Sequence, residues 1–506
     1  MLQRIALLTV LCGALIPTAS AQQQQGKASL DVSETLFSVI TTINVCGYDQ
    51  DLATSDPLRL RVLAEVNREI EKSYSAQQAR KNVCDYYRDH RQSDQSRDLA
   101  QYVSLALNLG PPPAFTPTIS EADLPPDAAS ILGIQHGLQN FYTGANLHDV
   151  WRRHAKEYDA LIDANNEAIA KMLLATDVYL KVPVGGYGGR RLSILVEPMA
   201  GASRSNARNY GTEYYIVVSP EKGELKIDQI RHTYLHFILD PLAMKRGTTM
   251  QRLSPLLDLV KNAPMDSTYK KDITLLLTES IIKAVEARTE PGKGPDAEQK
   301  RQQKVTEATR EGFILTPYFY EQLVQFEKDP RALQDTYGDW LHFIDLSREK
   351  HRASEIQFAS TSTPDVVSTV KPVNLLDEAE KYFVKGDYAR AKEIAQKALD
   401  SHSADPGRSY FVLARVELSS RNIDGAQALF QKAIESTHEP RFVAWSNIYL
   451  GRIFDLKSER DNALKHYRAA LDSGDTSSVT KSAAERGLKQ AYQPPASQKP
   501  QGTQEQ

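Results

Sequence analysis

Two histidines four residues apart, His232 and His236, are the side chains in this sequence best placed for metal chemistry. On a helix, residues at this spacing project from one face, so both imidazoles could bind a single zinc ion. The surrounding segment 225–240 is apolar almost all round and predicts a buried helix. A buried histidine pair needs a polar partner, which a metal would provide. The alternative is a pair of core histidines hydrogen-bonded to Asp228 or Asp240.

Glu279 is the candidate third ligand. It lies inside the apolar part of a second predicted helix, 272–288, where an unpaired carboxylate would be costly. It could bind the same ion, or it could pair with Lys283 one turn further along the helix. Asp240 is a poorer candidate ligand, because it would lie about 12 Å from His232 along an unbroken helix that rises about 1.5 Å per residue.

The two histidines and the later glutamate resemble the zinc site of the gluzincin metallopeptidases. That family has a His-Glu-x-x-His motif on one helix, a glutamate ligand on a later helix, and a sheet before the first of these helices. Here the β-branched and aromatic runs 191–199 and 213–219 predict two strands of such a sheet. The resemblance implies that His232, His236 and Glu279 bind zinc.

One residue of the family's motif differs. The glutamate that acts as general base in the family directly follows the first histidine, and here that position is Thr233. A threonine hydroxyl cannot take a proton from water at neutral pH, and loss of a positioned base costs about 10²–10⁴ in rate. We therefore expect no efficient peptidase activity. The alternative is a zinc-dependent peptidase with another base, for which Glu286, Tyr318 and Tyr320 are candidates.

These residues belong to a predicted N-terminal domain over 31–348, which is α+β, mainly helical with a small sheet. Pro241 is expected to end the helix that carries the histidines, since proline lacks the N–H that a helix interior needs. The polar segment 201–211 between the two strands is expected to be a loop whose arginines face water. The charged segment 291–304 is expected to be a second exposed loop.

The C-terminal third of the chain repeats itself. The segments 379–399, 414–434 and 451–471 align without gaps, and small residues recur at three positions of each. Small residues at fixed spacing let paired helices cross closely. The three sets are Ala379, Ala414 and Gly451, then Ala391, Ala426 and Ala463, then Ala398, Ala433 and Ala470.

The repeat pattern resembles the tetratricopeptide repeat (TPR), whose unit has about 34 residues. The resemblance implies an α-solenoid over 374–492, closed by a capping helix at 477–491, with a concave face that binds a protein or peptide. The fold class expected for the whole chain is therefore mainly α. Residues 349–373 are expected to link the two domains, and the polar segment 493–506 is expected to be a disordered tail.

The first residues predict export. Residues 1–21 combine Arg4, an apolar stretch of 12 residues and small residues up to Ala21, which is the layout of a secretory signal peptide. No later apolar run is long enough to span a membrane. In an exported chain, Cys46 and Cys84 are expected to form a disulfide that ties the first two helices together, with two buried thiols as the alternative.

Composition and charge narrow the function further. The chain has 506 residues, of which 41% are hydrophobic and 25% charged, and its formal charge is −3. These values are those of an ordinary globular protein and do not suggest binding to nucleic acid through charge. We expect an exported scaffold, periplasmic or secreted, whose repeats bind a protein or peptide and whose metallopeptidase-like domain is inactive.

Overall fold

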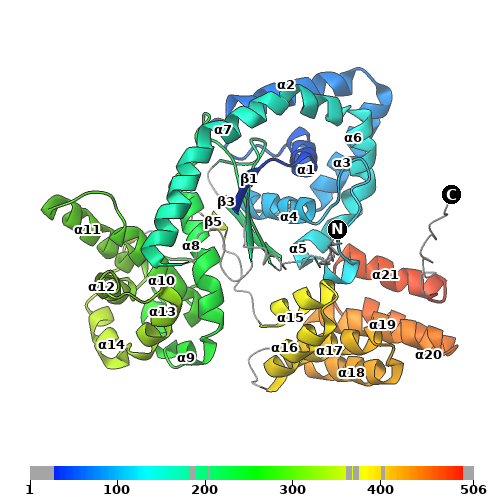
Figure 1. Ribbon diagram of the computed structural model, residues 1–506. Coiled ribbons are helices and arrows are strands. Elements are labelled where there is room, and N and C mark those ends of the chain that lie inside the picture. Colours follow the sequence, from blue (N-terminus) through cyan, green and yellow to red (C-terminus); the bar gives the residue numbers. More distant parts are fainter. Residues whose placement is uncertain are drawn as a thin grey trace, which may run out of the picture.

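The described part of the chain is mainly helical and contains one five-stranded sheet. Figure 1 shows helices α1–α7 around the sheet, α8–α14 to one side, and α15–α21 below. No described helix is both long and apolar enough to cross a bilayer. The expected signal peptide, and all but the first residue of the expected tail, lie outside the described residues. The computed structural model describes residues 28–182, 190–202, 205–210, 212–360, 367–368, 375–400 and 405–493.

Seven helices and two short 3-10 turns form the N-terminal layer. Ser33, Ser73 and Asp94 cap α1, α3 and α4, because their side chains accept hydrogen bonds from free N–H groups at the helix starts. The long α7 carries the chain from this layer to the sheet (Figure 1). The elements are α1 Glu34–Val45, α2 Pro57–Glu71, α3 Tyr74–Asp89, α4 Gln95–Leu107, η1 Glu121–Asp123, α5 Pro126–Ser130, η2 Leu132–Ile134, α6 Gln135–Gly144 and α7 Leu147–Leu180.

The expected disulfide forms, but it joins different helices from those predicted. Cys46 lies at the end of α1 and Cys84 lies within α3, and their Cα atoms are 4.9 Å apart. The expectation that the bond ties the first two helices is therefore wrong, because α1 also packs against α3. The crosslink connects positions 38 residues apart, which restricts the unfolded chain and stabilises this layer.

The sheet has mixed parallel and antiparallel pairing. Its strand order is β1-β2-β4-β3-β5, and β3 pairs antiparallel with β4 while the other neighbours are parallel. The two predicted strands are confirmed as β2 and β4. The strands are β1 Ala28–Asp31, β2 Arg191–Val196, β3 Ser205–Tyr210, β4 Glu213–Val218 and β5 Val367–Ser368.

Strand β3 lies in the segment that was expected to be a water-facing loop. Its Arg208 is largely buried, and the guanidinium donates hydrogen bonds to the backbone oxygens of Ala100 and Ala207. The same group lies 3.8 Å from the carboxylate of Asp127. The expectation of a loop is wrong because the segment pairs with β4, and backbone oxygens within the fold accept hydrogen bonds from both terminal nitrogens of this arginine.

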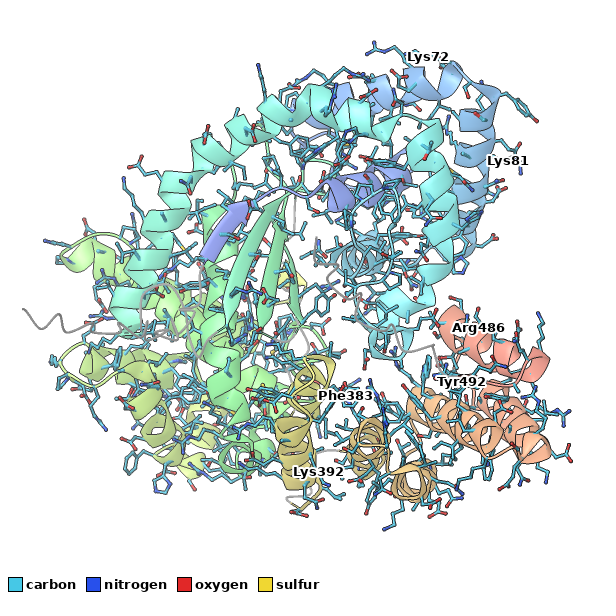
Figure 2. The ribbon with its side chains drawn as sticks, turned by 45° about the vertical axis from the view of Figure 1, so that its right-hand side comes forward. Lys72, Lys81, Phe383, Lys392, Arg486 and Tyr492 are labelled. Atoms are coloured by element: carbon cyan, nitrogen blue, oxygen red, sulfur yellow. A yellow bond between two sulfur atoms is a disulfide. The ribbon has the colours of Figure 1, made fainter. Side chains whose placement is uncertain are left out.

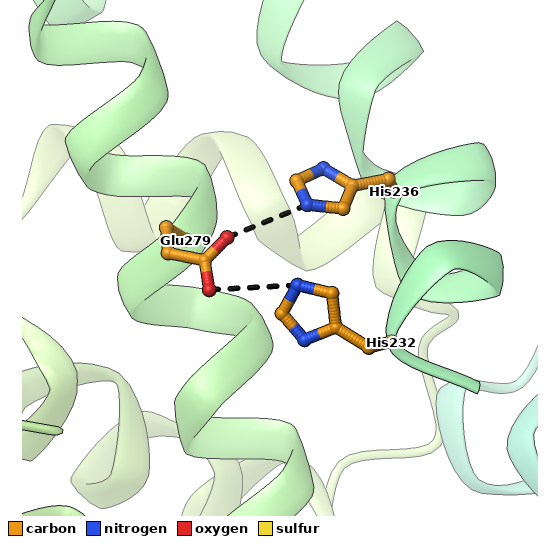
Figure 3. Close-up of side chains that lie close together, drawn as sticks. All are labelled: His232, His236 and Glu279. Carbon is orange, nitrogen blue, oxygen red and sulfur yellow. Dashed lines mark ion pairs between the residues drawn. The ribbon is translucent and has the colours of Figure 1, made fainter. Parts of the chain in front are cut away.

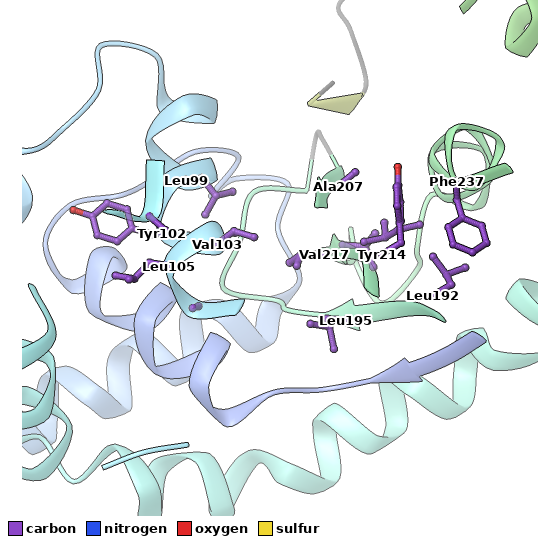
Figure 4. Close-up of a cluster of buried hydrophobic side chains, with 14 of the residues drawn as sticks. Leu99, Tyr102, Val103, Leu105, Leu192, Leu195, Ala207, Tyr214, Val217 and Phe237 are labelled. Carbon is purple, nitrogen blue, oxygen red and sulfur yellow. The ribbon is translucent and has the colours of Figure 1, made fainter. Parts of the chain in front are cut away.

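One hydrophobic core extends from α4 across the sheet to α8. Figure 4 shows Leu99 and Val103 of α4 at one end of a buried cluster, Phe237 of α8 at the other, and strand side chains between them. The ring of Tyr214 on β4 meets the ring of Phe237 edge-on, with centroids 5.3 Å apart. This packing holds one face of α8 against the sheet.

The helix that carries both histidines, α8 Ile227–Met244, continues through Pro241. Since proline lacks an N–H group, the carbonyl of Phe237 four residues earlier has no donor within the helix. The guanidinium of Arg190 supplies one, with its Nη1 atom 2.5 Å from the Phe237 oxygen. The same group stacks on the Phe237 ring. The expectation that Pro241 ends the helix is wrong because a distant side chain replaces the missing hydrogen bond.

The helices after α8 pack around α10. The expected exposed loop 291–304 instead leads into α11, which Pro295 opens at a position where the missing N–H costs nothing. Part of the expected linker 349–373 belongs to the N-terminal part, because α14 runs to Ser354 and β5 joins the sheet. The helices are α9 Gly247–Gln251, η3 Ser254–Val260, α10 Ile273–Arg288, α11 Pro295–Glu311, α12 Thr316–Phe326, α13 Leu333–His342 and α14 Leu346–Ser354.

The last seven helices, hereafter the array, pack one after another in sequence. All nine small residues of the repeats are buried. A Cβ atom on Gly451 would lie 2.6 Å from the ring of Tyr467, so α19 and α20 cross as closely as the pattern predicts. The helices are α15 Leu375–Val384, α16 Tyr388–Asp400, α17 Pro406–Ser419, α18 Ile423–Ser436, α19 Pro440–Leu456, α20 Arg460–Leu471 and α21 Ser478–Lys489.

Candidate metal centre

Two neighbouring helices bring the three predicted ligands together. His232 and His236 lie one turn apart on α8, and Glu279 lies on α10, which packs against α8. One potential ligand atom from each residue lies within 4.8 Å of the others. Figure 3 shows both imidazoles pointing from α8 towards the carboxylate on α10. Residues that are 47 positions apart in the chain are therefore neighbours in the fold.

The Nε2 atom of each histidine faces Glu279. His232 Nε2 lies 3.5 Å from Oε1, and His236 Nε2 lies 3.4 Å from Oε2. The three side chains are 16%, 10% and 3% exposed, respectively. Atoms that share a tetrahedral zinc ion at bond lengths of about 2.0–2.2 Å lie about 3.3–3.5 Å apart. The separations between these nitrogens and oxygens are therefore of the size that zinc coordination requires.

The Nδ1 atoms of the two histidines are held by two further carboxylates. His232 Nδ1 lies 2.8 Å from Oε1 of Glu286, and His236 Nδ1 lies 3.1 Å from Oδ1 of Asp240. A carboxylate at Nδ1 orients the ring and favours the tautomer whose Nε2 lone pair is free to bind a metal. Sequence reasoning missed this role of Glu286. Its position two turns after Glu279, on the same face of α10, is the signal that could have revealed it.

The buried charges at this site shift each other's pKa values. Burial lowers the pKa of His236, but the carboxylates of Asp240 and Glu279 outweigh this effect and raise it to about 10. Burial raises the pKa of Glu279, but the charges of His232, His236 and Lys283 outweigh it and hold that pKa well below its usual range. Protons and a metal cation would therefore compete for the same histidine nitrogens.

Two buried atoms at the centre make no hydrogen bond, namely Nε2 of His236 and Oε2 of Glu279. Buried polar atoms in proteins are nearly always paired. In addition, the site has a net charge of −2 when the histidines are neutral. Three carboxylates contribute to it, those of Glu279, Glu286 and Asp240, and the ammonium of Lys283 is the one nearby positive charge counted with them. A divalent cation would give both atoms a closer partner than the 3.4 Å ion pair that they form with each other, and it would balance the charge, so these residues fit a zinc ion.

Thr233, at the position of the family's general base, has its hydroxyl engaged elsewhere. The residue is fully buried, and the hydroxyl donates a hydrogen bond to a backbone oxygen one turn earlier in α8, at 2.9 Å. Glu286, a candidate substitute base, is bonded to His232. Tyr318 and Tyr320 donate their hydroxyl hydrogens to Trp340 and Glu298, away from the three ligands. Of these four residues only Glu286 lies beside the candidate ligands with a carboxylate, and that carboxylate is hydrogen-bonded to His232.

A polar pocket of about 380 Å³ opens beside the centre, and Glu286 and Lys283 form part of its wall. Most of the remaining lining residues are acidic or basic and come from α8, α11 and the segment after α10, so the pocket suits a polar or charged ligand rather than an apolar one. These charged side chains are Asp228, Arg231, Glu290, Lys304, Glu307 and Glu311.

Comparisons with known proteins do not identify a relative. No protein-family model, curated protein or solved structure matches the sequence. The interpretation of this centre therefore depends on its geometry, which consists of an anchored histidine pair on one helix, a buried carboxylate on the next, and a polar pocket beside them.

Proposed function

We propose that this chain is an exported binding protein, periplasmic or secreted, with two working parts. The N-terminal part holds one zinc ion through His232, His236 and Glu279 and has little or no peptidase activity. The array is a TPR solenoid that binds a protein or peptide. One observation supports the metal-binding part. The two imidazoles are held by carboxylates at Nδ1 and face the buried carboxylate of Glu279, and neither His236 Nε2 nor Glu279 Oε2 makes a hydrogen bond.

The side chains around the site support metal binding better than hydrolysis. Zinc bound there would act as a Lewis acid and would lower the pKa of a coordinated water. Hydrolysis would also need a protein base to accept a proton, and the Thr233 hydroxyl instead donates to the helix backbone. Glu286 and Asp240 are used to orient the two rings. We therefore infer a domain derived from a peptidase fold that has kept the ligands and lost the base.

A zinc-dependent peptidase is the second candidate. Two observations favour it: the described part of the chain offers three protein ligands, which is the number typical of catalytic zinc sites, and the polar pocket adjoins Glu286. In this alternative a residue other than Thr233 accepts the proton, and the array presents the substrate.

The TPR interpretation of the array is supported by its packing. The helices form successive pairs, and the small residue at each repeating position is buried where two helices cross. In stacked helix repeats of this kind the concave surface is where partners bind.

Metal content tests the first part of the proposal. We would measure zinc by mass spectrometry after the purified mature protein has been incubated with zinc and dialysed, for wild type, His232→Ala and His136→Ala. We expect about one zinc per chain in wild type and in His136→Ala, whose histidine is exposed on α6, and none in His232→Ala. A wild-type protein without zinc would refute the metal site.

Restoring the base distinguishes the two candidates. We expect wild type to show no zinc-dependent cleavage of a mixed fluorogenic peptide library, and Thr233→Glu to exceed Thr233→Gln by about 100-fold or more, since a positioned base contributes about 10²–10⁴. Because Thr233 is buried, thermal unfolding of both variants must be compared with wild type. Wild-type cleavage that a chelator abolishes would favour the peptidase.

A further inference from the structure

The face of the array formed by the first helix of each pair is turned towards the N-terminal part. Figure 1 shows α15, α17 and α19 on the near side and α16, α18 and α20 on the far side. Arginines of α17, α19 and α21 make polar contacts across this face, namely Arg415, Arg441 and Arg486. Figure 2 shows Arg486 on α21, close to the N-terminal part. In stacked helix repeats, such a face is where partners are expected to bind.

Arg415 makes the strongest of these contacts. Its guanidinium binds the Asp123 carboxylate with two parallel bonds, Nη1 to Oδ1 at 2.6 Å and Nη2 to Oδ2 at 2.7 Å. Both side chains are almost fully buried. The guanidinium also stacks on Phe383 of α15 at 4.1 Å and lies 5.5 Å from the ring of Phe411. An arginine held between rings presents its planar fork to a carboxylate at little entropic cost.

Two further arginines bind the residues on either side of Asp123. Arg441 of α19 donates from Nη2 to the backbone oxygen of Ala122 at 3.0 Å and to that of Leu124. Arg486 of α21 lies 2.9 Å from the carboxylate of Glu121. The Leu124 side chain is buried. The array thus contacts two acidic side chains and two backbone carbonyls within four consecutive positions.

This contact differs from an ordinary packed domain interface. The bound segment contains the 3-10 turn η1, whose residues each remain partly exposed as a whole, although the Asp123 side chain is almost fully buried. The contact consists mainly of arginine hydrogen bonds to carboxylates and carbonyls, which is how proteins recognise short acidic segments. A second contact, where α21 meets α5 and η2, would keep the array attached if this segment were released.

We propose that the arginine face of the array is a recognition site for a short acidic segment, and that the chain's own Glu121–Leu124 occupies it. The external partner is a protein that carries a similar acidic segment, and it must displace the internal one. This inference deepens the array's part of the proposed function and is independent of the metal centre. An internal segment acts at an effective concentration of about 1 mM, so it excludes weaker external ligands.

The test uses the full-length mature protein and a fluorescent peptide that spans residues 117–127. We would measure peptide binding by fluorescence anisotropy for wild type, for the double variant Glu121→Ala/Asp123→Ala, and for the double variant with Arg415→Ala added. We expect the double variant to bind the peptide at least 10-fold more tightly than wild type, because the internal competitor is weakened. Adding Arg415→Ala should reduce this affinity at least 10-fold.

A second peptide tests the charge recognition. It carries Glu121→Gln and Asp123→Asn, and we expect the double variant to bind it at least 10-fold more weakly than the acidic peptide. Equal binding of the two peptides would overturn the inference while leaving the array as a peptide-binding module. No binding of either peptide by any variant would overturn both the inference and the proposed role of the array. If the double variant does not fold, Asp123→Asn, which preserves side-chain size, replaces it.

Discussion

The array and the metal centre depend on different properties of their side chains. In the array, buried alanines and glycines set how closely the helices cross, so the size of each side chain matters most. At the metal centre, His232 and His236 are oriented by carboxylates and face a third one, so charge and hydrogen bonding matter most. A change of size at constant chemistry should therefore damage the array, and a change of chemistry at constant size should damage the centre.

The largest expected effect comes from Glu197, a buried glutamate that lies outside the metal centre. Glu197 is fully buried, and it accepts hydrogen bonds from the Met199 backbone and the Tyr158 hydroxyl. Burial raises its pKa to about 8, although both hydrogen bonds and Arg59 act against burial. The carboxyl is therefore protonated in the folded protein at neutral pH. Glu279 differs: burial raises its pKa too, but the positive charges around it outweigh burial and lower that pKa.

Because the folded pKa of Glu197 lies above the unfolded value of about 4.5, the folded state binds the extra proton. Its contribution to stability is complete below pH 4.5 and is lost as the pH rises to about 8. The total loss is about 5 kcal/mol, at about 1.4 kcal/mol per unit of difference between these two pKa values. We expect Glu197→Gln, which keeps the size, to remove this decline in urea unfolding experiments between pH 5 and 8. An unchanged pH dependence in the variant would contradict the assignment.

The next effect tests the role of size in the array. A Cβ atom on Gly487 of α21 would collide with the ring of Tyr467. We expect Gly487→Leu to lower the free energy of unfolding of the array by about 3 kcal/mol, since overpacking a close contact costs about this much. Zinc content should not change. Gly247→Leu is the control, because a Cβ atom there meets nothing within 4 Å. Equal melting temperatures for the two variants would show that the crossing is not close-packed.

The third prediction tests the role of chemistry at the metal centre. Asp240→Asn and Glu286→Gln preserve size but remove the charges that orient the histidine rings. We expect each to weaken zinc affinity by about 10–100-fold, as measured by competition with a chromophoric chelator. The melting temperature without metal should change little. Glu307→Gln, an exposed change in the neighbouring pocket, is the matched control. Affinities equal to that of this control would show that the rings need no anchoring.

The smallest expected effect links the sheet to the metal-binding helix. We expect Arg190→Met to lower the free energy of unfolding by about 1.5 kcal/mol, because it removes a charged donor from the Phe237 carbonyl. In a Pro241→Ala background the helix regains its own donor, so the same change should cost less. A double-mutant cycle in urea measures this coupling. Additive effects of the two changes would show that Arg190 does not compensate for Pro241.

Sequence reasoning succeeded where the determining interactions are local. The small residues Ala391, Ala426 and Ala463 recur once in each repeat and are buried, and the helix expected at 477–491 is α21. The hydrophobic runs 191–199 and 213–219 likewise predicted the strands β2 and β4. The ligands at the metal centre were selected by a family resemblance, and the structure places them together without testing whether they bind zinc.

Sequence reasoning failed where a distant residue changes the local preference. Arg190 allows α8 to pass through Pro241, although proline alone predicts the end of a helix. The backbone of α4 and the carboxylate of Asp127 accommodate Arg208, although its polar segment alone predicts a loop. No short-range pattern contains these partners, since they belong to other elements.

The contact between the array and Glu121–Leu124 has a consequence for the time course of synthesis. Asp123 and Arg415 are 292 residues apart, and Glu121 and Arg486 are 365 apart. At about 5–20 residues per second, the last of these arginines is made about 20–70 s after the acidic segment. Throughout that interval the segment is uncovered, and a chain cut short before α17 never covers it. A nascent or truncated chain would therefore present the same acidic sequence that the array of a finished molecule binds.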